Sequence, residues 1–369
     1  NRADDTVVIL GGYGNTGKLL ARLLLAHTSC RLVLAGRHPE RAAALVEALN
    51  EETGDRRVQA ARADAADGDS LRCLLAGKSW LIVASSTAQY TETVAQAALS
   101  AGCNYLDLQY SWEKIEALRR MAGEIAASGL TFITDGGFHP GLPAALIRYA
   151  AQAMVGIEEA LVGSVIRVDW RAANVDPGTV VELLEEFADF RMVVYEGGAW
   201  RPQTMWRSMR MGFDHGFGEQ SCIPMFLEEL RPLPEQIPSL RSAGFFVGGF
   251  NRFVDWLVSP LAVVGMRLRS AAVHRALTRL MGWGLKRFSR PPYGTVLQLE
   301  ARGPGAKALR VSVYHEDGYA LTAIPVVAAL LQLREQREPG LHWQANAVNP
   351  ARLMEDMVRL GATVEVTRE

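Results

Sequence analysis

The sequence predicts an α/β fold in which a doubly wound parallel sheet is followed by an inserted α+β domain. The first third of the chain alternates short β-branched runs with longer amphipathic runs, which is the pattern of repeated βα units. After about Pro140 the pattern changes to longer helical segments and hairpin-like strands. The length of 369 residues suits two domains, each large enough to bury a core.

The first domain is expected to contain six strands and five helices. The strands are expected at 6–10, 31–35, 57–61, 79–84, 104–108 and 130–134. The helices are expected at 17–27, 40–50, 69–76, 88–101 and 112–128, where Leu, Ala, Val and Ile recur at helical spacing. Strands and helices that alternate in this way predict a parallel sheet with helices on both faces.

The rest of the chain is expected to form a different architecture. Strands are expected at 160–169 and 192–195, a hairpin at 296–301 and 309–314, and helices at 319–335 and 350–360. These elements predict an α+β domain with an antiparallel sheet. We expect domains at 1–140 and 141–318, and a helical tail, 319–369, that packs back on the first domain because it is too short to form its own core.

Charge and composition exclude several classes of partner. There are 39 Lys and Arg against 40 Asp and Glu, so no basic field attracts nucleic acid. The four cysteines form no C-x-x-C pair, which argues against a metal site and a disulfide framework and favours a reducing, cytoplasmic compartment. The longest uncharged stretch, 318–333, is too short for a membrane span, and the charged start at residues 1–5 does not resemble a signal peptide.

A glycine-rich turn follows the first strand. Its sequence is Gly12-Tyr13-Gly14-Asn15-Thr16-Gly17, a G-x-G-x-x-G pattern between an apolar strand and a Leu/Ala helix, with a second strand ending near residue 35. The glycines permit a tight turn, close approach of a pyrophosphate and close helix packing, and the phosphates bind at the positive end of the helix. This context predicts a Rossmann-type dinucleotide-binding domain.

The end of the second strand indicates which nicotinamide cofactor is bound. The strand ends in Leu34-Ala35-Gly36-Arg37, with no carboxylate to bind an unphosphorylated ribose. The Arg37 guanidinium can instead pair with a 2′-phosphate and stack on adenine. We therefore predict NADP, the alternative being that Arg37 is a solvated residue at the start of the next helix.

Two further loops leave the carboxyl ends of predicted strands. Asp64 follows the third strand, and Ser85-Ser86-Thr87 follow the fourth. Ligands of open α/β sheets bind at this edge, so Asp64 is expected near the adenine and Ser85–Thr87 near the nicotinamide half. Both segments are also ordinary loop sequences.

These segments together resemble the saccharopine dehydrogenase-like oxidoreductases. The resemblance rests on 8–14, 35–37, 101–108, the Gly-Gly-Phe-His-Pro-Gly turn at 136–141, and the closing segment 339–361. It implies a Rossmann domain, an inserted domain that carries substrate and dimer contacts, and a tail that returns to the first domain. It also implies an NADP-dependent enzyme acting at a C–N bond of an amino-acid-derived or amine substrate.

Three residues near the predicted strand ends are candidates for catalysis. His139 is the best-placed titratable residue, and Asp107 with Tyr110 comes next. An iminium substrate is already cationic and needs little acid catalysis, whereas an enone or carbonyl needs a proton. Each candidate also has a structural interpretation, His139 as a hinge residue and Asp107 as a loop cap. The reaction is expected in a cleft between the sheet edge and the middle domain.

Two segments of the middle domain are candidates for contacts with other molecules. Arg207, Arg210 and His215, close to Trp206, could form a carboxylate-binding wall or a solvated helix face. The apolar run at 243–266 could be core, a homodimer interface, an apolar substrate pocket or a peripheral membrane contact flanked by Arg252, Arg267 and Arg269.

The sequence leaves two alternatives to the C–N oxidoreductase. The apolar run favours an NADPH-dependent reductase of an apolar C=C or C=O compound, such as a lipid or polyketide intermediate. The absence of a sharp acid–base pair favours a membrane-associated protein that binds cofactor without turnover. A homodimer is the expected assembly.

Overall fold

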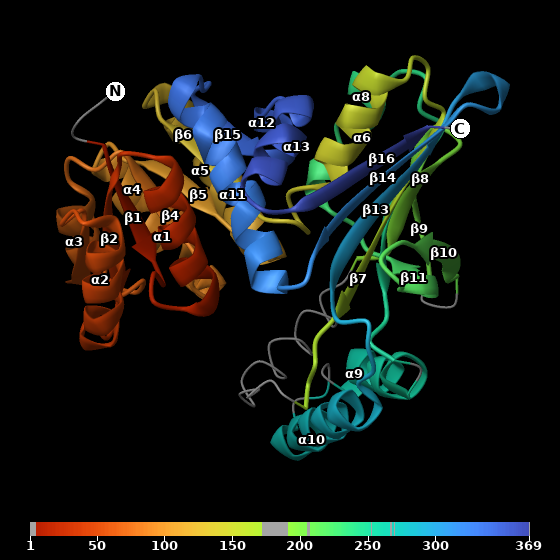
Figure 1. Ribbon diagram of the computed structural model, residues 1–369, viewed down its shortest axis with the longest axis horizontal. Helices are drawn as coiled ribbons and strands as arrows, with labels where there is room; N and C mark the ends of the chain where they lie inside the picture. Colours follow the sequence, from red (N-terminus) through yellow and green to blue (C-terminus); the bar gives the residue numbers. More distant parts are fainter. Residues whose placement is uncertain are drawn as a thin grey trace. The chain divides into compact units, whose positions relative to one another are not determined.

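The computed structural model describes residues 5–171, 191–204, 207–251, 253–265, 268 and 270–368 (Figure 1). The chain divides into two compact units. The first consists of Asn1–Ala145 and Tyr319–Ala362, and the second of Leu146–Gly318 and Thr363–Glu369. Each unit is therefore assembled from separate stretches of the chain.

The first unit contains a seven-stranded sheet, as far as the described residues show, in the order β15-β6-β5-β4-β1-β2-β3. All neighbouring strands pair in parallel. The strands are β1 (Thr6–Leu10), β2 (Arg31–Gly36), β3 (Val58–Arg62), β4 (Trp80–Val83), β5 (Asn104–Asp107), β6 (Thr131–Thr134) and β15 (Gly340–Trp343). The six predicted strands are all present, and the doubly wound fold class is confirmed.

Helices connect these strands as the apolar periodicity predicts. They are α1 (Asn15–His27), α2 (Glu40–Thr53), α3 (Gly68–Leu75), η1 (Ala88–Tyr90), α4 (Thr91–Ser100) and α5 (Trp112–Ala127). Helix α1 packs against α2, whereas α3, α4 and α5 pack in a row. Right-handed crossovers on either side of β1 place these two groups on opposite faces of the sheet.

The buried strand residues explain the cohesion of this unit. Val8, Leu81, Tyr105 and Phe132 each lie at most 1% exposed in one cluster with side chains of α3, α4 and α5. The rings of Tyr105 and Phe132 stack at 5.1 Å between centroids. Strands this apolar on both faces are typical of a parallel sheet that helices cover.

The tail contributes one strand and three helices to the first unit. These are β15, α11 (Gly318–Glu335), α12 (Gln344–Ala347) and α13 (Pro350–Arg359). Strand β15 pairs with β6, opposite Thr131 to Thr134, and no sequence pattern predicted it. Four residues without clear alternation carry too little periodic signal to distinguish a strand from a loop.

The second unit is built on a mixed sheet. Its main path is β10-β11-β12-β7-β13-β14-β16, and β8 pairs with both β12 and β9. The strands are β7 (Glu159–Arg167), β8 (Val193–Glu196), β9 (Ala199–Pro202), β10 (Met209–Phe213), β11 (Gly218–Pro224), β12 (Ser242–Gly248), β13 (Gly294–Arg302), β14 (Ala308–His315) and β16 (Thr363–Arg368). The predicted β13–β14 hairpin is confirmed, but β12 and β7 are parallel, so the sheet is not purely antiparallel.

Helices flank this sheet before and after β12. They are α6 (Pro143–Ala153), η2 (Glu228–Leu230), α8 (Leu233–Gln236), η3 (Val254–Val258), α9 (Ser259–Gly265) and α10 (Ala271–Phe288), with η4 (Pro304–Ala306) in the β13–β14 hairpin. The apolar run at 243–266 therefore divides. Its first part is the interior strand β12, with Phe245 fully buried, and its second part forms η3 and α9. The expected anchors Arg252, Arg267 and Arg269 lie outside the described residues.

The end of the tail differs from the expectation that 319–369 packs wholly on the first domain. Strand β16 pairs antiparallel with β14 in the second unit, from Thr363 opposite Tyr314 to Arg368 opposite Leu309. All of its residues except Val364 are exposed, so no apolar period in the sequence marks this strand.

Candidate functional site

The turn between β1 and α1 needs glycine at three positions, one because of its backbone conformation and two because neighbouring atoms leave no room for a side chain. Gly11 has a φ of +83°, a conformation that side chains disfavour. A Cβ on Gly12 would lie 2.9 Å from the Cα of Leu34 on β2. A Cβ on Gly17 would lie against the carbonyl oxygen of Gly11, far inside contact distance. These glycines therefore let α1 begin directly against the sheet.

Gly14 has a less crowded environment, because an added Cβ would meet only one backbone atom. It is exposed and forms the N-cap of α1, and an added Cβ would meet only the carbonyl oxygen of Gly11, at 3.2 Å. The first amides of a helix have no intrahelical acceptor, and the helix dipole makes this end positive. The amides of Asn15, Thr16 and Gly17 therefore border a space that suits a phosphate.

Tyr13 organises the loop that follows β2. A Cβ on Gly36 would lie 2.5 Å from the Tyr13 hydroxyl oxygen, so the ring rests on this glycine. The same hydroxyl accepts a 3.1 Å hydrogen bond from the His38 N–H. Arg37 lies between Gly36 and His38 in the sequence and is exposed. Its side chain forms no hydrogen bond or ion pair within the described part of the chain. Its guanidinium is therefore available to an external anion.

Asp64 lies in the loop after β3 and is exposed. One of its carboxylate oxygens accepts a 3.1 Å hydrogen bond from the Ala66 N–H, which fixes the turn. The loop is tied to the end of β2 because the Ala63 N–H donates to the Gly36 carbonyl at 3.0 Å. Asp64 therefore lies in a loop that is attached to the end of β2, directly before Arg37.

Ser85, Ser86 and Thr87 follow β4. The hydroxyls of Ser85 and Thr87 are 3.0 Å apart, while Ser86 is exposed. The Ser85 carbonyl accepts a hydrogen bond from the side-chain amide of Gln109, in the loop after β5. The loops after β4 and β5 are therefore held together by one side chain.

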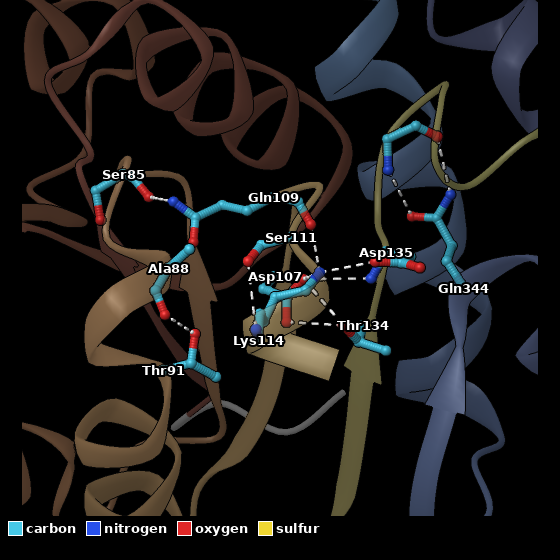
Figure 2. Close-up of polar contacts among 11 residues, drawn as sticks. Ser85, Ala88, Thr91, Asp107, Gln109, Ser111, Lys114, Thr134, Asp135 and Gln344 are labelled. Atoms are coloured by element: carbon cyan, nitrogen blue, oxygen red, sulfur yellow. Dashed lines mark hydrogen bonds and ion pairs between the residues drawn. The ribbon is translucent and has the colours of Figure 1, made fainter. Parts of the chain in front are cut away.

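A buried ion cluster lies at the ends of β5 and β6 (Figure 2). The Lys114 ammonium is 2.6 Å from Asp107 Oδ1 and 2.7 Å from Asp135 Oδ1, and the three side chains are at most 1% exposed. The ammonium also donates to the Gln109 carbonyl, and the Thr134 hydroxyl donates to Asp107 at 3.0 Å. One lysine on α5 thus connects the ends of two strands and the loop between them.

The electrostatics of this cluster keep its lysine charged. Burial by itself lowers the pKa of Lys114, but the attraction of Asp107 and Asp135 outweighs burial and raises that pKa. Burial, followed by the charge of Asp107, raises the pKa of Tyr105 well above its ordinary value. Asp107 therefore orders the strand ends, and a direct catalytic role for it stays a prediction.

Gln344 connects the tail to the turn after β6. The buried amide of Gln344, on α12, accepts a hydrogen bond from the Gly137 N–H at 3.3 Å and donates to the Gly137 carbonyl at 3.1 Å. A Cβ on Gly141 would lie 2.8 Å from the Gln344 nitrogen. The glycines of this turn thus make room for a side chain from the far end of the sequence.

Sequence reasoning missed Lys114, Gln109 and Gln344. Lys114 carried a signal, because it stands on the apolar stripe of α5 that continues with Leu118 and Met121. A lysine on a buried helix face is rarely left unpaired, so its position there indicates a buried ion cluster. Gln109 and Gln344 carried no comparable signal, since their roles depend on contacts between separate loops.

His139 and Tyr110 lie in the loops after β6 and β5. His139 is half-buried, its ring packs against Phe138 at 4.1 Å, and burial lowers its pKa to about 3. Tyr110 is half-buried, and its hydroxyl accepts a 3.1 Å hydrogen bond from the Trp112 indole. At neutral pH His139 is therefore uncharged and cannot donate a proton as an imidazolium.

The structure does not bring Arg207, Arg210 and His215 together. Each contacts a different neighbour: Arg207 contacts Glu196 (3.2 Å), Arg210 contacts Glu219 (3.7 Å), and His215 stacks on Tyr314 (centroids 4.3 Å). Trp206, which the sequence groups with them, lies outside the described residues. The closeness of these residues in the sequence does not place them on one helix face, because Arg210 lies in β10 and His215 in the turn after it.

Arg210 lines a cavity of about 990 Å³ within the second unit, together with Arg167 and Asp255. One Asp255 oxygen accepts a 2.9 Å hydrogen bond from the Phe250 N–H, and a Cβ on Gly249 would collide with the carboxylate. Burial raises the pKa of Asp255 to about 7, against the opposing effect of those backbone amides and Arg167. The cavity therefore combines arginines with a carboxyl group that is only partly ionised at neutral pH.

Two kinds of feature are absent from the described residues. Over the described ranges, no three His, Cys, Asp or Glu side chains come together as metal ligands. No helix within those ranges has the length and apolar character needed to cross a membrane.

The glycine turn, β1 to β6 and the intervening helices match a known protein family. Residues 7–133 match the model of the saccharopine dehydrogenase NADP binding domain. Residues 7–133 of the first unit are therefore similar to the NADP-binding domain of saccharopine dehydrogenases. The family resemblance and the NADP cofactor predicted from the sequence are thereby confirmed, as is the broader class of NAD(P)-dependent oxidoreductases.

A solved structure shows the same fold. Apo saccharopine dehydrogenase (L-Glu forming) from Saccharomyces cerevisiae aligns over 99% of this chain and 100% of its own, with a TM-score of 0.70 and 13% identity. A dehydrogenase from Chromobacterium violaceum covers 98% of this chain and 94% of its own, with a TM-score of 0.46 and 11% identity. No significant match was found among curated protein sequences.

The saccharopine dehydrogenase-type domain has room and charge for its cofactor. The exposed Gly14, at the positive end of α1, suits the approach of a pyrophosphate, and the unengaged Arg37 suits an additional phosphate. When bound, NADP supplies or accepts the hydride. The protein's own contribution is to bind, to orient and to control protons.

Proposed function

We propose that this protein is an NADP-dependent oxidoreductase acting at a C–N centre, an imine or secondary amine, of an amino-acid-derived or amine substrate. The observation that carries the proposal is the state of its candidate acids. Burial keeps His139 neutral, and Asp107 is engaged by Lys114. An iminium carbon is already electrophilic, so a site without a strong acid suits it better than a carbonyl.

The cofactor contacts are assigned from the geometry of the first unit. Gly12 to Gly17 would bind the pyrophosphate at the start of α1, and Arg37 would pair with the 2′-phosphate. Asp64 would border the adenine, and Ser85, with Ser86 and Thr87, the nicotinamide half. The Gln109 bridge to the Ser85 carbonyl supports this last assignment, because it fixes the loop that must present those hydroxyls.

The substrate contacts are assigned to the second unit. Arg210 and Arg167 both line the cavity of that unit, where they would attract the carboxylate of an amino-acid-derived substrate. Arg207 and His215 are less favoured, because neither lines this cavity. In the first unit, His139 and Tyr110 would orient the substrate or a proton-carrying water.

The experiment is a screen of NADPH oxidation by the purified full chain. It compares cyclic imines and mixtures of a 2-oxo acid with an amine against enones and simple ketones. We expect turnover on the C–N substrates and a drop of at least tenfold in the Arg210→Gln variant. Turnover on enones alone would contradict the C–N proposal, and tight NADPH binding without turnover on any substrate would favour a non-catalytic protein.

The alternative reductase of apolar compounds keeps only part of its support. That hypothesis relied on the apolar run at 243–266, and residues 243–248 of this run form the interior strand β12. Phe245 is fully buried there and Phe246 is 7% exposed. These two side chains are core, whereas Phe250 and Phe253 of the same run line the cavity of the second unit, so this part of the run remains compatible with an apolar substrate.

A further inference from the structure

The chain on either side of Arg37 is held by hydrogen bonds. The connection from β2 to α2, in which Arg37 lies, is short. Before it, the Gly36 carbonyl accepts a 3.0 Å hydrogen bond from the Ala63 N–H. After it, the His38 N–H donates to the Tyr13 hydroxyl at 3.1 Å. The backbone around Arg37 is therefore fixed from both sides, although its side chain is exposed.

The second of these hydrogen bonds comes from the glycine turn itself, because Tyr13 belongs to the turn that borders the start of α1. A Cβ on Gly36 would lie 2.5 Å from the Tyr13 hydroxyl oxygen and 2.6 Å from its Cε1, so the ring rests on this glycine. The ring of His38 takes no part in the contact, since its Nδ1 lies 3.1 Å from Glu40 Oε1. The link between turn and loop thus depends on one hydroxyl and one main-chain amide.

This link matters because NADPH carries two anionic groups on one sugar. The pyrophosphate and the 2′-phosphate are attached to the same adenosine ribose, so their separation varies only within narrow limits. A protein binds both groups best when its two anion sites are already held at that separation, since no loop then has to be ordered on binding. NADH lacks the 2′-phosphate, so the spacing of the two sites has no effect on its affinity.

We propose that Tyr13 is a positioning residue that sets the preference for NADPH over NADH. Its hydroxyl holds the loop of Arg37 at a fixed place beside the amides at the start of α1, so that the 2′-phosphate and the pyrophosphate are bound together. Tyr13 acts through Arg37 and needs no contact of its own with the cofactor. The inference rests on the proposed pairing of Arg37 with the 2′-phosphate, and it names the side chain on which that pairing depends.

The test is a double-mutant cycle on the affinities of the full chain for NADPH and NADH, measured by fluorescence titration. Tyr13→Phe removes the hydroxyl and keeps the ring on Gly36. Because one hydrogen bond of this kind contributes about three- to tenfold, Tyr13→Phe should weaken NADPH binding by about that factor and change NADH binding by less than about twofold. In the Arg37→Ala background, Tyr13→Phe should have no further effect on NADPH affinity, since the residue it positions is gone.

The matched control is Thr53→Val. The Thr53 hydroxyl donates to the Leu49 carbonyl at 2.9 Å, at the opposite end of α2 from Arg37, so its loss should leave both affinities unchanged.

Three results would overturn the inference about Tyr13. An equal loss of NADPH and NADH affinity in Tyr13→Phe would show a merely structural role. A loss of NADPH affinity that persists in the Arg37→Ala background would show that the hydroxyl contacts the phosphate directly. An unchanged preference in Tyr13→Phe, while Arg37→Ala narrows it, would overturn this inference alone. An unchanged preference in Arg37→Ala would instead remove the 2′-phosphate contact on which both proposals rest.

Discussion

Replacing Lys114 with methionine should destabilise the first unit severely. Methionine matches the length of lysine but leaves Asp107 and Asp135 facing each other without a countercharge, and both are at most 1% exposed. Removing one partner from a buried ion cluster costs about 3–5 kcal/mol. With a denaturant dependence of roughly 2 kcal/mol per molar, the urea midpoint of this unit should fall by about 2 M.

The assay is urea unfolding of the full chain, followed with and without NADPH. A ligand raises the midpoint only of the unit that binds it, so the transition that NADPH shifts reports on the first unit. Arg120→Met is the control, because Arg120 lies on the same helix and pairs with Glu92 at 3.0 Å in an exposed position. Loss of this exposed ion pair should lower the free energy of unfolding by less than about 1 kcal/mol.

The sign of the pH dependence provides a second check. Without Lys114, burial and mutual repulsion raise the pKa values of the two carboxyls in the folded variant above their unfolded values. The folded variant then binds more protons than the unfolded chain, so its deficit should shrink as the pH falls from 7 to 5. A Lys114→Met midpoint within about 0.5 M of the Arg120→Met midpoint at pH 7 would refute the reasoning, since m-values near 2 make that gap about 1 kcal/mol.

Four further predictions concern the cofactor, the candidate acid and the cavity. Gly14→Val should abolish measurable NADPH binding in a fluorescence titration, because its side chain would fill the phosphate space; wild-type affinity would remove the glycine turn from the proposal. Arg37→Ala should narrow the preference for NADPH over NADH, and equal affinities in the unmodified protein would contradict the assigned 2′-phosphate contact. His139→Ala should lower kcat by no more than about tenfold at unchanged NADPH affinity, because a neutral imidazole can orient substrate or water but cannot donate a proton; the wild-type profile between pH 5 and 8 should show no inflection from His139, whose pKa is about 3, and a loss of about a hundredfold would contradict the proposed site without a strong acid. Asp255→Asn should stabilise the second unit more at pH 8 than at pH 5. The folded pKa of Asp255, about 7, lies above its unfolded value, so the stability of the wild-type protein falls as the pH rises from about 4 to 7. Thermal unfolding of both proteins at the two pH values measures this effect, and a difference in melting temperature between variant and wild type that is the same at pH 5 and pH 8 would contradict it.

The sequence predicted the first sheet well because each of its first six strands carries its own signal. Strand β1, for example, is a β-branched run followed directly by a glycine turn, and residues 31–36 repeat the apolar pattern before Arg37. Strands β15 and β16 have no such local signal. The first is recognised only by its pairing with β6 and the second only by its pairing with β14, and both partners are distant in the sequence.

The same distinction applies to the candidate site. Gly14 and Arg37 could be assigned from the sequence, because their function depends on a backbone conformation and a position at a strand end. The partners of Asp107 could not be found in this way, because Lys114 reaches it from the next helix. The low pKa of His139 was also inaccessible, since it reflects the packing of surrounding segments and not the residue type.

The pairing of β15 with β6 has a consequence for biosynthesis. The ribosome completes β6 long before it reaches residues 340–343, and at about 5–20 residues per second the delay is roughly 10–40 s. During that interval β6 is an open sheet edge, on which a strand of another nascent chain can pair. The second unit must also wait, for β16 to reach β14. A fragment that ends at residue 318 would keep both edges open permanently, so we expect it to aggregate when expressed without the segment that follows.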